Sequence, residues 1–372
     1  MPIKVLVIIG TRPEVIKMAP VLYELKQHPK VFDVKLCVIN QQFGILELSL
    51  REWELRPDYR IELKISQFDF TTMLASMLAP LRERLLDLKP NLVLVHGDTT
   101  TALAGALTAF GAGVTVGHVE AGLRSHDLQK PFPEEFNRVT IDRLASVLYA
   151  PTEIARLNLL REGYKEDNIV VVGNTVVDAL LLTSETSIAK LPQAVWHNGH
   201  RMLLVTSHRR ENFGDGVRSI CEALRTLLFM YSGINVVYVM HPNPNAHEPI
   251  METLKETPRL RLTGPCSYQE FIKLMCESFL IITDSGGVQE EAPYFGKPVL
   301  VLREETERPE SIERGIAQIV STDPKVIVEA VIELLDDETK YNLMARQVQL
   351  YGDGHAAGRI RTDLSRRFVL SS

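Results

Sequence analysis

Apolar stretches rich in Val, Ile and Leu recur along the chain and alternate with longer helix-like segments. Eight such stretches stand at 4–10, 34–40, 91–97, 114–120, 201–207, 234–241, 279–285 and 298–304. They lack polar alternation, which is typical of parallel strands covered by helices on both faces. Residues 12–27 and 323–337 show the pattern of such helices. The alternation therefore predicts an α/β fold with right-handed crossovers.

This rhythm breaks at residues 186–200, which are irregular, contain a proline and precede a new strand-like stretch. A chain of 372 residues also exceeds one typical core. We therefore expect two Rossmann-like, doubly wound domains that face each other across a cleft, with ligand sites at the carboxyl ends of their strands. The expected domains cover 1–175 and 200–355, and 356–372 is expected to form a helix that packs back on the first domain.

Composition narrows the class of protein. A hydrophobic content of 45% and a charged content of 24% are those of an ordinary soluble globular protein. The net charge of −6 and the pI near 6.0 argue against a broad nucleic-acid-binding surface. The four cysteines are scattered, which predicts reduced thiols rather than a zinc site or disulfides. No signal peptide or membrane-length apolar segment stands out, so we expect a cytoplasmic protein without membrane or nucleic-acid partners.

In the first half, charged residues follow the predicted strands. Arg12 lies in the GTRPE turn, where it suits a phosphate but equally an exposed loop. Asp98 and Glu120 end two apolar stretches, and Glu134 opens another predicted helix. Each alone is explained as a cap or a helix-dipole partner. Together on one side of a sheet, crowded acids raise each other's pKa, so one of them becomes a candidate general acid or base.

In the second half, His208 with Arg209 and Arg210 follows the strand at 201–207 and provides one titratable group beside two cations. His241 ends a later strand, but PNPN is equally a plain loop. A solvated charge run is the alternative for the first cluster. Its place at a strand end favours a ligand-binding role.

The stretch ITDSGGVQEEAP raises a sharper question, because two glycines separate a strand from adjacent carboxylates. Ser285, Gly286 and Gly287 lie where backbone N–H groups and a helix dipole would point outward, an arrangement that binds phosphate. A Cβ there would block the anion. Glu291 lies a turn further in and suits hydrogen bonds from a ribose. The alternative is a helix start with stabilising acids.

Ten motifs in order make the chain similar to one family. They are GTRPEVIK, HGDTTTALAG, GHVEAGLR, PFPEEFNR, GNTVVDAL, SHRREN, HPNPN, DSGGVQEEAP, GKPVLVLREETERPE and YGDG. From about residue 3 to 360 the sequence resembles non-hydrolysing UDP-N-acetylglucosamine 2-epimerases. The resemblance implies the glycosyltransferase-B arrangement of two Rossmann-like domains, a homodimer, and no metal, nicotinamide or flavin cofactor.

The family interconverts UDP-N-acetylglucosamine and UDP-N-acetylmannosamine by anti elimination of UDP to 2-acetamidoglucal and re-addition. The resemblance implies that the acid, base and leaving-group roles belong to Lys17, Asp98, Glu120, Glu134 and His208. It implies further contacts to the UDP-sugar from Arg12, Arg138, His241, Phe271, Ser285, Gly286 and Gly287. Glu291 is expected to bind the ribose.

Two departures from the family pattern leave alternatives open. Gln41, Gln42, Phe43 and Gly44 stand where QHRE is usual, which argues against a second, activating UDP-N-acetylglucosamine site or for a different sugar there. Ser207 replaces a glycine and is expected to narrow the pocket or alter water access at His208. A hydrolysing epimerase, an epimerase of another N-acetylated UDP-sugar, a glycosyltransferase-B transferase and a UDP-sugar sensor remain as alternatives.

Overall fold

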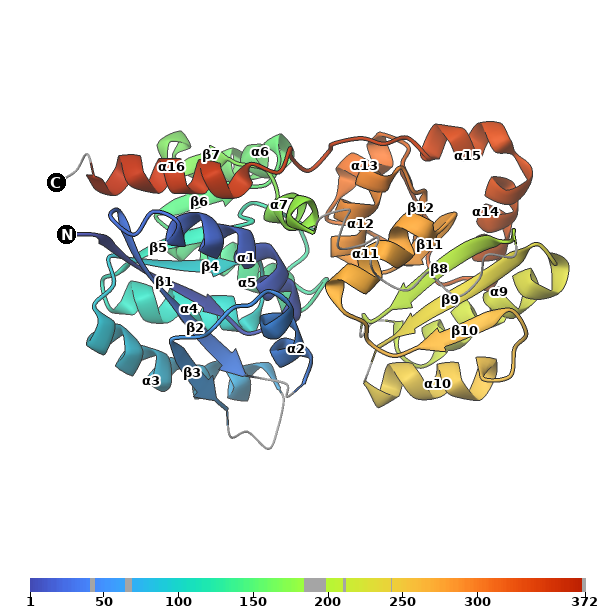
Figure 1. Ribbon diagram of the computed structural model, residues 1–372, viewed down its shortest axis with the longest axis horizontal. Helices are drawn as coiled ribbons and strands as arrows, with labels where there is room; N and C mark the ends of the chain where they lie inside the picture. Colours follow the sequence, from blue (N-terminus) through green and yellow to red (C-terminus); the bar gives the residue numbers. More distant parts are fainter. Residues whose placement is uncertain (41–43, 64–68, 184–198, 210–211, 242, 370–372) are drawn as a thin grey trace. The chain divides into compact units, whose positions relative to one another are not determined.

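The computed structural model describes residues 1–369 apart from 41–43, 64–68, 184–198, 210–211 and 242. The chain forms two compact units (Figure 1): unit 1 comprises Met1–Leu182 with Tyr351–Ser372, and unit 2 comprises Thr183–Leu350. The C-terminal segment of the chain therefore belongs to unit 1. Between the last helix before the break, α7 (Thr175–Leu182), and the first strand after it, β8 (Arg201–Ser207), most residues lie outside the described part.

Unit 1 contains a seven-stranded sheet in the order β3-β2-β1-β4-β5-β6-β7, and all its strand pairs are parallel. Its strands are β1 (Ile3–Ile9), β2 (Phe32–Asn40), β3 (Tyr59–Glu62), β4 (Leu92–His96), β5 (Thr115–Val119), β6 (Val147–Ala150) and β7 (Ile169–Val171). Its helices are α1 (Arg12–Lys26), α2 (Ile45–Glu52), α3 (Phe70–Leu88), α4 (Thr100–Gly111), α5 (Glu134–Leu144), α6 (Glu153–Arg161), α7 and α16 (Ala356–Val369).

Helices cover both faces of this sheet. Helix α4 packs between α3 and α5, whereas α1 packs against α7 and α16 (Figure 1). Leu6 and Ile8 of β1 belong to the core beneath α3 and α4. Val5 and Val7, whose side chains point to the other face of the sheet, are equally buried. Burial on both faces explains why the strand shows no polar alternation.

Helix α16 closes unit 1. Asp178 of α7 accepts hydrogen bonds from the amides of Ala356 and Ala357 at 3.2 and 2.8 Å, which satisfies the start of α16. The side chain of Asp363 accepts from the Tyr149 hydroxyl at 3.1 Å.

Unit 2 contains a six-stranded parallel sheet in the order β10-β9-β8-β11-β12-β13. Beside β8, its strands are β9 (Ile234–Met240), β10 (Leu260–Thr263), β11 (Leu280–Thr283), β12 (Val299–Val301) and β13 (Ala317–Ile319). Its helices are α9 (Asp215–Met230), α10 (Pro244–Leu254), α11 (Tyr268–Glu277), α12 (Gly286–Glu291), α13 (Pro309–Glu313), α14 (Pro324–Asp336) and α15 (Glu338–Met344). The predicted α/β fold with two doubly wound sheets is confirmed.

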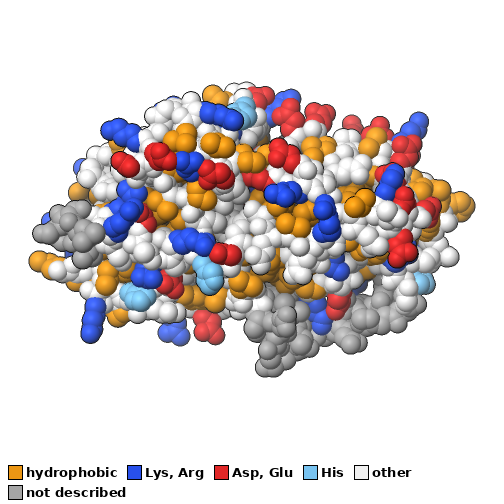
Figure 2. Space-filling view, turned by 90° about the horizontal axis from the view of Figure 1, so that it is seen from above, with side chains coloured by type: hydrophobic (Ala, Val, Ile, Leu, Met, Phe, Trp, Pro, Cys, Tyr) orange, Lys and Arg blue, Asp and Glu red, His pale blue; other side chains and the backbone are white. Residues whose placement is uncertain are grey.

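Each sheet therefore reverses its strand order between its first and fourth strands, which is where ligands bind in open parallel sheets. The reversal lies between β1 and β4 in unit 1 and between β8 and β11 in unit 2. On the face drawn in Figure 2, basic and acidic side chains are interspersed. Among the described residues, no helix is both long and apolar enough to cross a bilayer.

Candidate active site

Glu120 directly follows β5 and is the centre of a buried polar cluster in unit 1. Its backbone has φ 71°, a left-handed conformation that side chains other than glycine rarely adopt and that is common at functional sites. Its Oε2 atom forms an ion pair with Lys17 Nζ and accepts a hydrogen bond from Asn174 Nδ2 at 2.9 Å. Two predicted residues, Lys17 and Glu120, therefore meet, although 103 positions separate them.

His96 and Glu14 extend this cluster. His96 ends β4, and its Nε2 atom lies 3.6 Å from Glu120 Oε2. Glu14, in the first turn of α1, is fully buried and accepts from the Gly10 amide at 3.0 Å and from the hydroxyls of Thr11 and Thr99, each at 2.8 Å. Burial raises the pKa of Glu14, and these hydrogen bonds lower it only in part.

His118, on the neighbouring strand, is tied between two elements. Its Nδ1 atom lies 2.6 Å from Asp142 of α5, and its Nε2 atom lies 2.8 Å from the carbonyl oxygen of Gly97. Asp142 is buried, but His118 and Arg124 outweigh that burial and lower its pKa. This network fixes the loop after β4 against α5.

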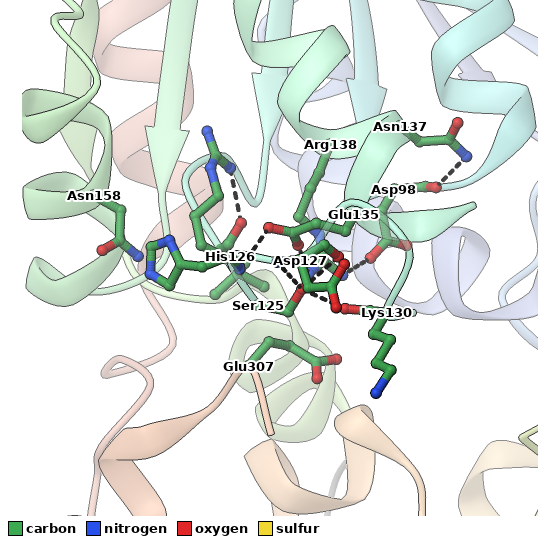
Figure 3. Close-up of polar contacts among 12 residues, drawn as sticks. Asp98, Ser125, His126, Asp127, Lys130, Glu135, Asn137, Arg138, Asn158 and Glu307 are labelled. Carbon is green, nitrogen blue, oxygen red and sulfur yellow. Dashed lines mark hydrogen bonds and ion pairs between the residues drawn. The ribbon is translucent and has the colours of Figure 1, made fainter. Parts of the chain in front are cut away.

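Asp98 lies on that loop and pairs with Arg138 of α5 (Figure 3). Arg138 also donates to Glu135 at 2.8 Å, and Asn137 Nδ2 donates to the Asp98 carbonyl at 2.8 Å. Glu134, the first residue of α5, is half-buried. Asp98 and Glu120 are thus each paired with a cation, which differs from the predicted mutual crowding of acids. Arg12, the first residue of α1, is also half-buried.

In unit 2 the corresponding cluster is built on Asp284, which follows β11 and is fully buried. Its carboxylate accepts from the amides of His208 and Arg209 at 3.0 Å, from Asn212 Nδ2 at 2.9 Å, and pairs with His208 Nδ1 at 2.9 Å. Burial alone would raise the pKa of Asp284, but these partners, His208 foremost, lower it to about 2. The carboxylate therefore fixes the loop that carries His208.

His241 follows β9, and its ring centroid lies 6.3 Å from that of His208. Its Nδ1 atom accepts from the Asn243 amide at 3.2 Å, so Nε2 carries the hydrogen in the neutral ring. Burial and His208 lower the pKa of His241. The ring is thus suited to donate one hydrogen bond while uncharged. Phe271, in α11, is half-buried.

The segment Ser285–Gly287 opens α12, and its two glycines have different surroundings. A Cβ at Gly286 would lie 2.5 Å from the Arg308 guanidinium, whereas at Gly287 the nearest neighbour would be Ser285 Oγ at 4.0 Å. Gly286 is therefore required by close packing against Arg308, and the open side of the loop lies at Gly287. That both glycines also leave room for an anion stays a prediction.

Arg308 belongs to a buried charge cluster behind this loop. It donates to Glu290 at 2.8 Å, and Glu307 pairs with Arg308, Arg303 and Arg209. Three guanidinium groups thus meet two carboxylates behind the glycines. Glu291 accepts from the Tyr268 hydroxyl at 2.9 Å.

The sequence departs from the family pattern at Ser207 and at residues 41–44. The Ser207 hydroxyl is buried and lies 2.6 Å from the Tyr238 hydroxyl. Its effect on the pocket or on water access at His208 stays a prediction. Positions 41–43 lie outside the described residues, as does Arg210, while Gly44 precedes α2 with φ 112°.

Comparison with known proteins assigns this chain to a family. A sequence model described as UDP-N-acetylglucosamine 2-epimerase matches residues 23–365. A relative of that name from Salmonella typhimurium is 45% identical over 96% of this chain and 97% of its own length. The chain belongs to the UDP-N-acetylglucosamine 2-epimerase family.

Solved structures of this family agree with the fold. The enzyme from Neisseria meningitidis bound to UDP-GlcNAc has a TM-score of 0.95 and 38% identity, covering 98% of this chain and 100% of that one. The Methanocaldococcus jannaschii enzyme in complex with UDP-GlcNAc and UDP has a TM-score of 0.86 and 34% identity, covering 98% and 99%. MurG from Acinetobacter baumannii, at 14% identity and a TM-score of 0.61, shares the fold alone.

Five residues of these clusters were not predicted as site residues from the sequence: Glu14, His96, Asn174, Asp284 and Arg308. Asn174 stands in GNTVVDAL and Asp284 in DSGGVQEEAP, so both motifs were visible but their roles were not. His96 directly precedes the GDT motif and reads as the end of a strand. Within the described residues, no group of three His, Cys, Asp or Glu side chains is arranged to hold a metal ion.

Proposed function

We propose that the chain catalyses the reversible epimerisation of UDP-N-acetylglucosamine to UDP-N-acetylmannosamine at C2. The observation that carries this proposal is the buried Glu120 carboxylate, held by Lys17 and Asn174 in a member of this family. A weakly acidic C–H bond needs a fixed base, and a carboxylate oriented by two donors is fixed. Relatives crystallised with UDP-GlcNAc support the substrate class.

In this proposal unit 2 binds UDP. The N–H groups at Ser285–Gly287, with Arg308 packed against Gly286, offer donors and positive charge to the diphosphate. His208 and the neutral His241 donate further hydrogen bonds, and His208 assists the departure of UDP. Glu291, oriented by Tyr268, accepts from the ribose hydroxyls, and Phe271 lies against the nucleotide.

Unit 1 supplies the proton chemistry. One carboxylate of Glu120, Asp98 and Glu134 removes the C2 proton as the C1–O bond to UDP breaks, which gives 2-acetamidoglucal and UDP. UDP then adds back to C1, and C2 takes a proton on the opposite face. Lys17 and Arg138 pair with Glu120 and Asp98 and orient these carboxylates. Arg12 is assigned to the diphosphate.

The test is incubation with UDP-N-acetylglucosamine in deuterated buffer, followed by NMR of the products. Epimerisation places deuterium at C2 of an intact UDP-sugar, whereas hydrolysis releases N-acetylmannosamine and UDP. Loss of UDP only with an added acceptor, without exchange at C2, would instead indicate a transferase. We extend the proposal to a cytoplasmic homodimer, which light scattering tests.

A further inference from the structure

His96 is a buried imidazole whose function the proposed reaction has not yet used. It is 3% exposed, and its Nε2 atom has no hydrogen-bond partner among the described residues. Buried ring nitrogens are normally satisfied, so an unsatisfied one requires an explanation. Glu120 Oε2 lies 3.6 Å from this nitrogen, which is beyond hydrogen-bond distance.

The same Glu120 oxygen already receives Lys17 and Asn174. While Glu120 is ionised, the ammonium group of Lys17 holds the carboxylate, and His96 remains unpaired. Once Glu120 has taken a proton, the attraction to Lys17 weakens because the carboxyl group is neutral. A rotation of the carboxyl group then brings its O–H to His96 Nε2.

The other charged and titratable groups around His96 are compatible with a contact between His96 and a protonated Glu120. Glu14, in the first turn of α1, interacts electrostatically with His96 and is fully buried. Lys17 lies on the same helix, and His118 on β5 is engaged with Gly97 and Asp142 and does not compete for Glu120.

We propose that His96 is a positioning residue that accepts the proton gained by Glu120 and returns it. This inference rests on the proposed function. The Oε2–H bond of Glu120 breaks as an Nε2–H bond of His96 forms, which leaves the Glu120 carboxylate between Lys17 and an imidazolium at His96. The reverse transfer restores the starting state, and no oxidant or other reactant is needed.

The experiment compares wild type with His96→Gln and His96→Asn, because an amide donates hydrogen bonds but does not take up a proton. We measure kcat and KM for UDP-N-acetylglucosamine from pH 5 to 9, C2 deuterium exchange and thermal unfolding. Both variants are expected to lose about 10- to 100-fold in kcat with less than about threefold change in KM, and to lose one ionisation from the kcat–pH profile. His28→Gln, at a half-buried position of unit 1 whose side chain is 43% exposed, is the matched substitution and is expected to behave like wild type.

A double substitution separates this role from a structural one. Since His96 acts through Glu120, His96→Gln/Glu120→Gln is expected to be no slower than Glu120→Gln alone. Multiplied losses in the double variant, or an unchanged pH profile in the single variants, overturn the proposal. A wild type that exchanges no deuterium at C2 overturns the proposed function itself, whereas an exchanging wild type with fully active His96 variants overturns only the role of His96.

Discussion

The two sheets share one strand order, and in each a buried carboxylate joins the loops on either side of the order reversal. In unit 1 Glu14, after β1, reaches Thr99, after β4. In unit 2 Asp284, after β11, reaches the amides of His208 and Arg209, after β8. The pKa of Glu14 is raised by burial, whereas that of Asp284 is lowered to about 2 despite burial.

The difference lies in the donors. Asp284 receives two backbone amides, an Asn side chain and a histidine, while Glu14 receives one amide and two hydroxyls. Charged carboxylates are stabilised by such amides and cations, and hydroxyls compensate burial less completely. The same topology thus surrounds one buried carboxylate with amides and a histidine and the other mainly with hydroxyls. We propose phosphate binding for the loops around the first and proton transfer for the cluster around the second.

The largest effect is expected from the carboxylates of unit 1. Glu120→Gln, Asp98→Asn and Glu134→Gln should each lower kcat by ~10²–10⁴, because proton transfer is lost, with modest change in UDP affinity. Steady-state kinetics and calorimetric UDP titration measure both. Glu83→Gln, an exposed position on α3, is the control. Near-normal turnover in all three variants would show that these carboxylates of unit 1 do not carry out the proton transfer.

Asp284→Asn tests the other unit and should lower the unfolding free energy of unit 2 by about 2–4 kcal/mol at pH 7. An amide cannot accept from all the donors that surround this carboxylate. Urea unfolding with a fluorescence or circular dichroism probe measures the loss.

The pH dependence follows from the sign of the shift. A carboxyl with its pKa lowered from 3.8 to about 2 stabilises the fold above pH 3.8, and this contribution is lost as pH falls through 2. The advantage of wild type over Asp284→Asn should therefore shrink by about 2 kcal/mol between pH 5 and pH 2. A difference that stays constant over this range would mean that Asp284 is not ionised in the fold.

The two glycines of the loop proposed to bind phosphate, Gly286 and Gly287, give a matched pair of smaller effects. Gly286→Ala displaces the buried Arg308 guanidinium and should lower the unfolding free energy by about 1–3 kcal/mol, besides weakening UDP binding. Gly287→Ala has room in the fold and should weaken UDP about 10-fold without destabilising the protein. Equal stability losses in both variants would contradict the assigned surroundings.

The sequence predicts the fold well wherever strands are long. The apolar stretches at 4–10, 34–40 and 201–207 become β1, β2 and β8. Strands β3, β6, β7, β10 and β13, of three or four residues each, were not predicted. The equally short β11 and β12 were predicted, because each lies within a longer apolar stretch, at 279–285 and 298–304.

The clusters were predictable only in part. Position at a strand end locates Asp98 and Glu120, because carboxyl ends of parallel strands share one edge. Their partners depend on packing between distant segments, as with Asn174, which lies 54 positions from Glu120. The packing of Arg308 against Gly286 likewise joins two loops that no local pattern connects.

Glu14→Gln is expected to have the smallest effect and sharpens the comparison most directly. The amide can keep the Gly10 bond through its oxygen and donate to a threonine hydroxyl, so stability at pH 7 should stay within about 1 kcal/mol of wild type. Because burial raises the folded pKa of Glu14, the stability that wild type has below pH 4.5 is lost as pH rises through that folded value.

The neutral glutamine escapes that loss, so stability relative to wild type should move in favour of Glu14→Gln as pH rises, opposite to Asp284→Asn. Urea unfolding of both variants and wild type from pH 4 to 8 provides the measurement. If the unfolding free energy of Glu14→Gln instead falls relative to wild type as pH rises, Glu14 stabilises the fold in its ionised form, as Asp284 does. The two units would then treat their buried carboxylates alike, and the contrast between them would rest on the cations alone.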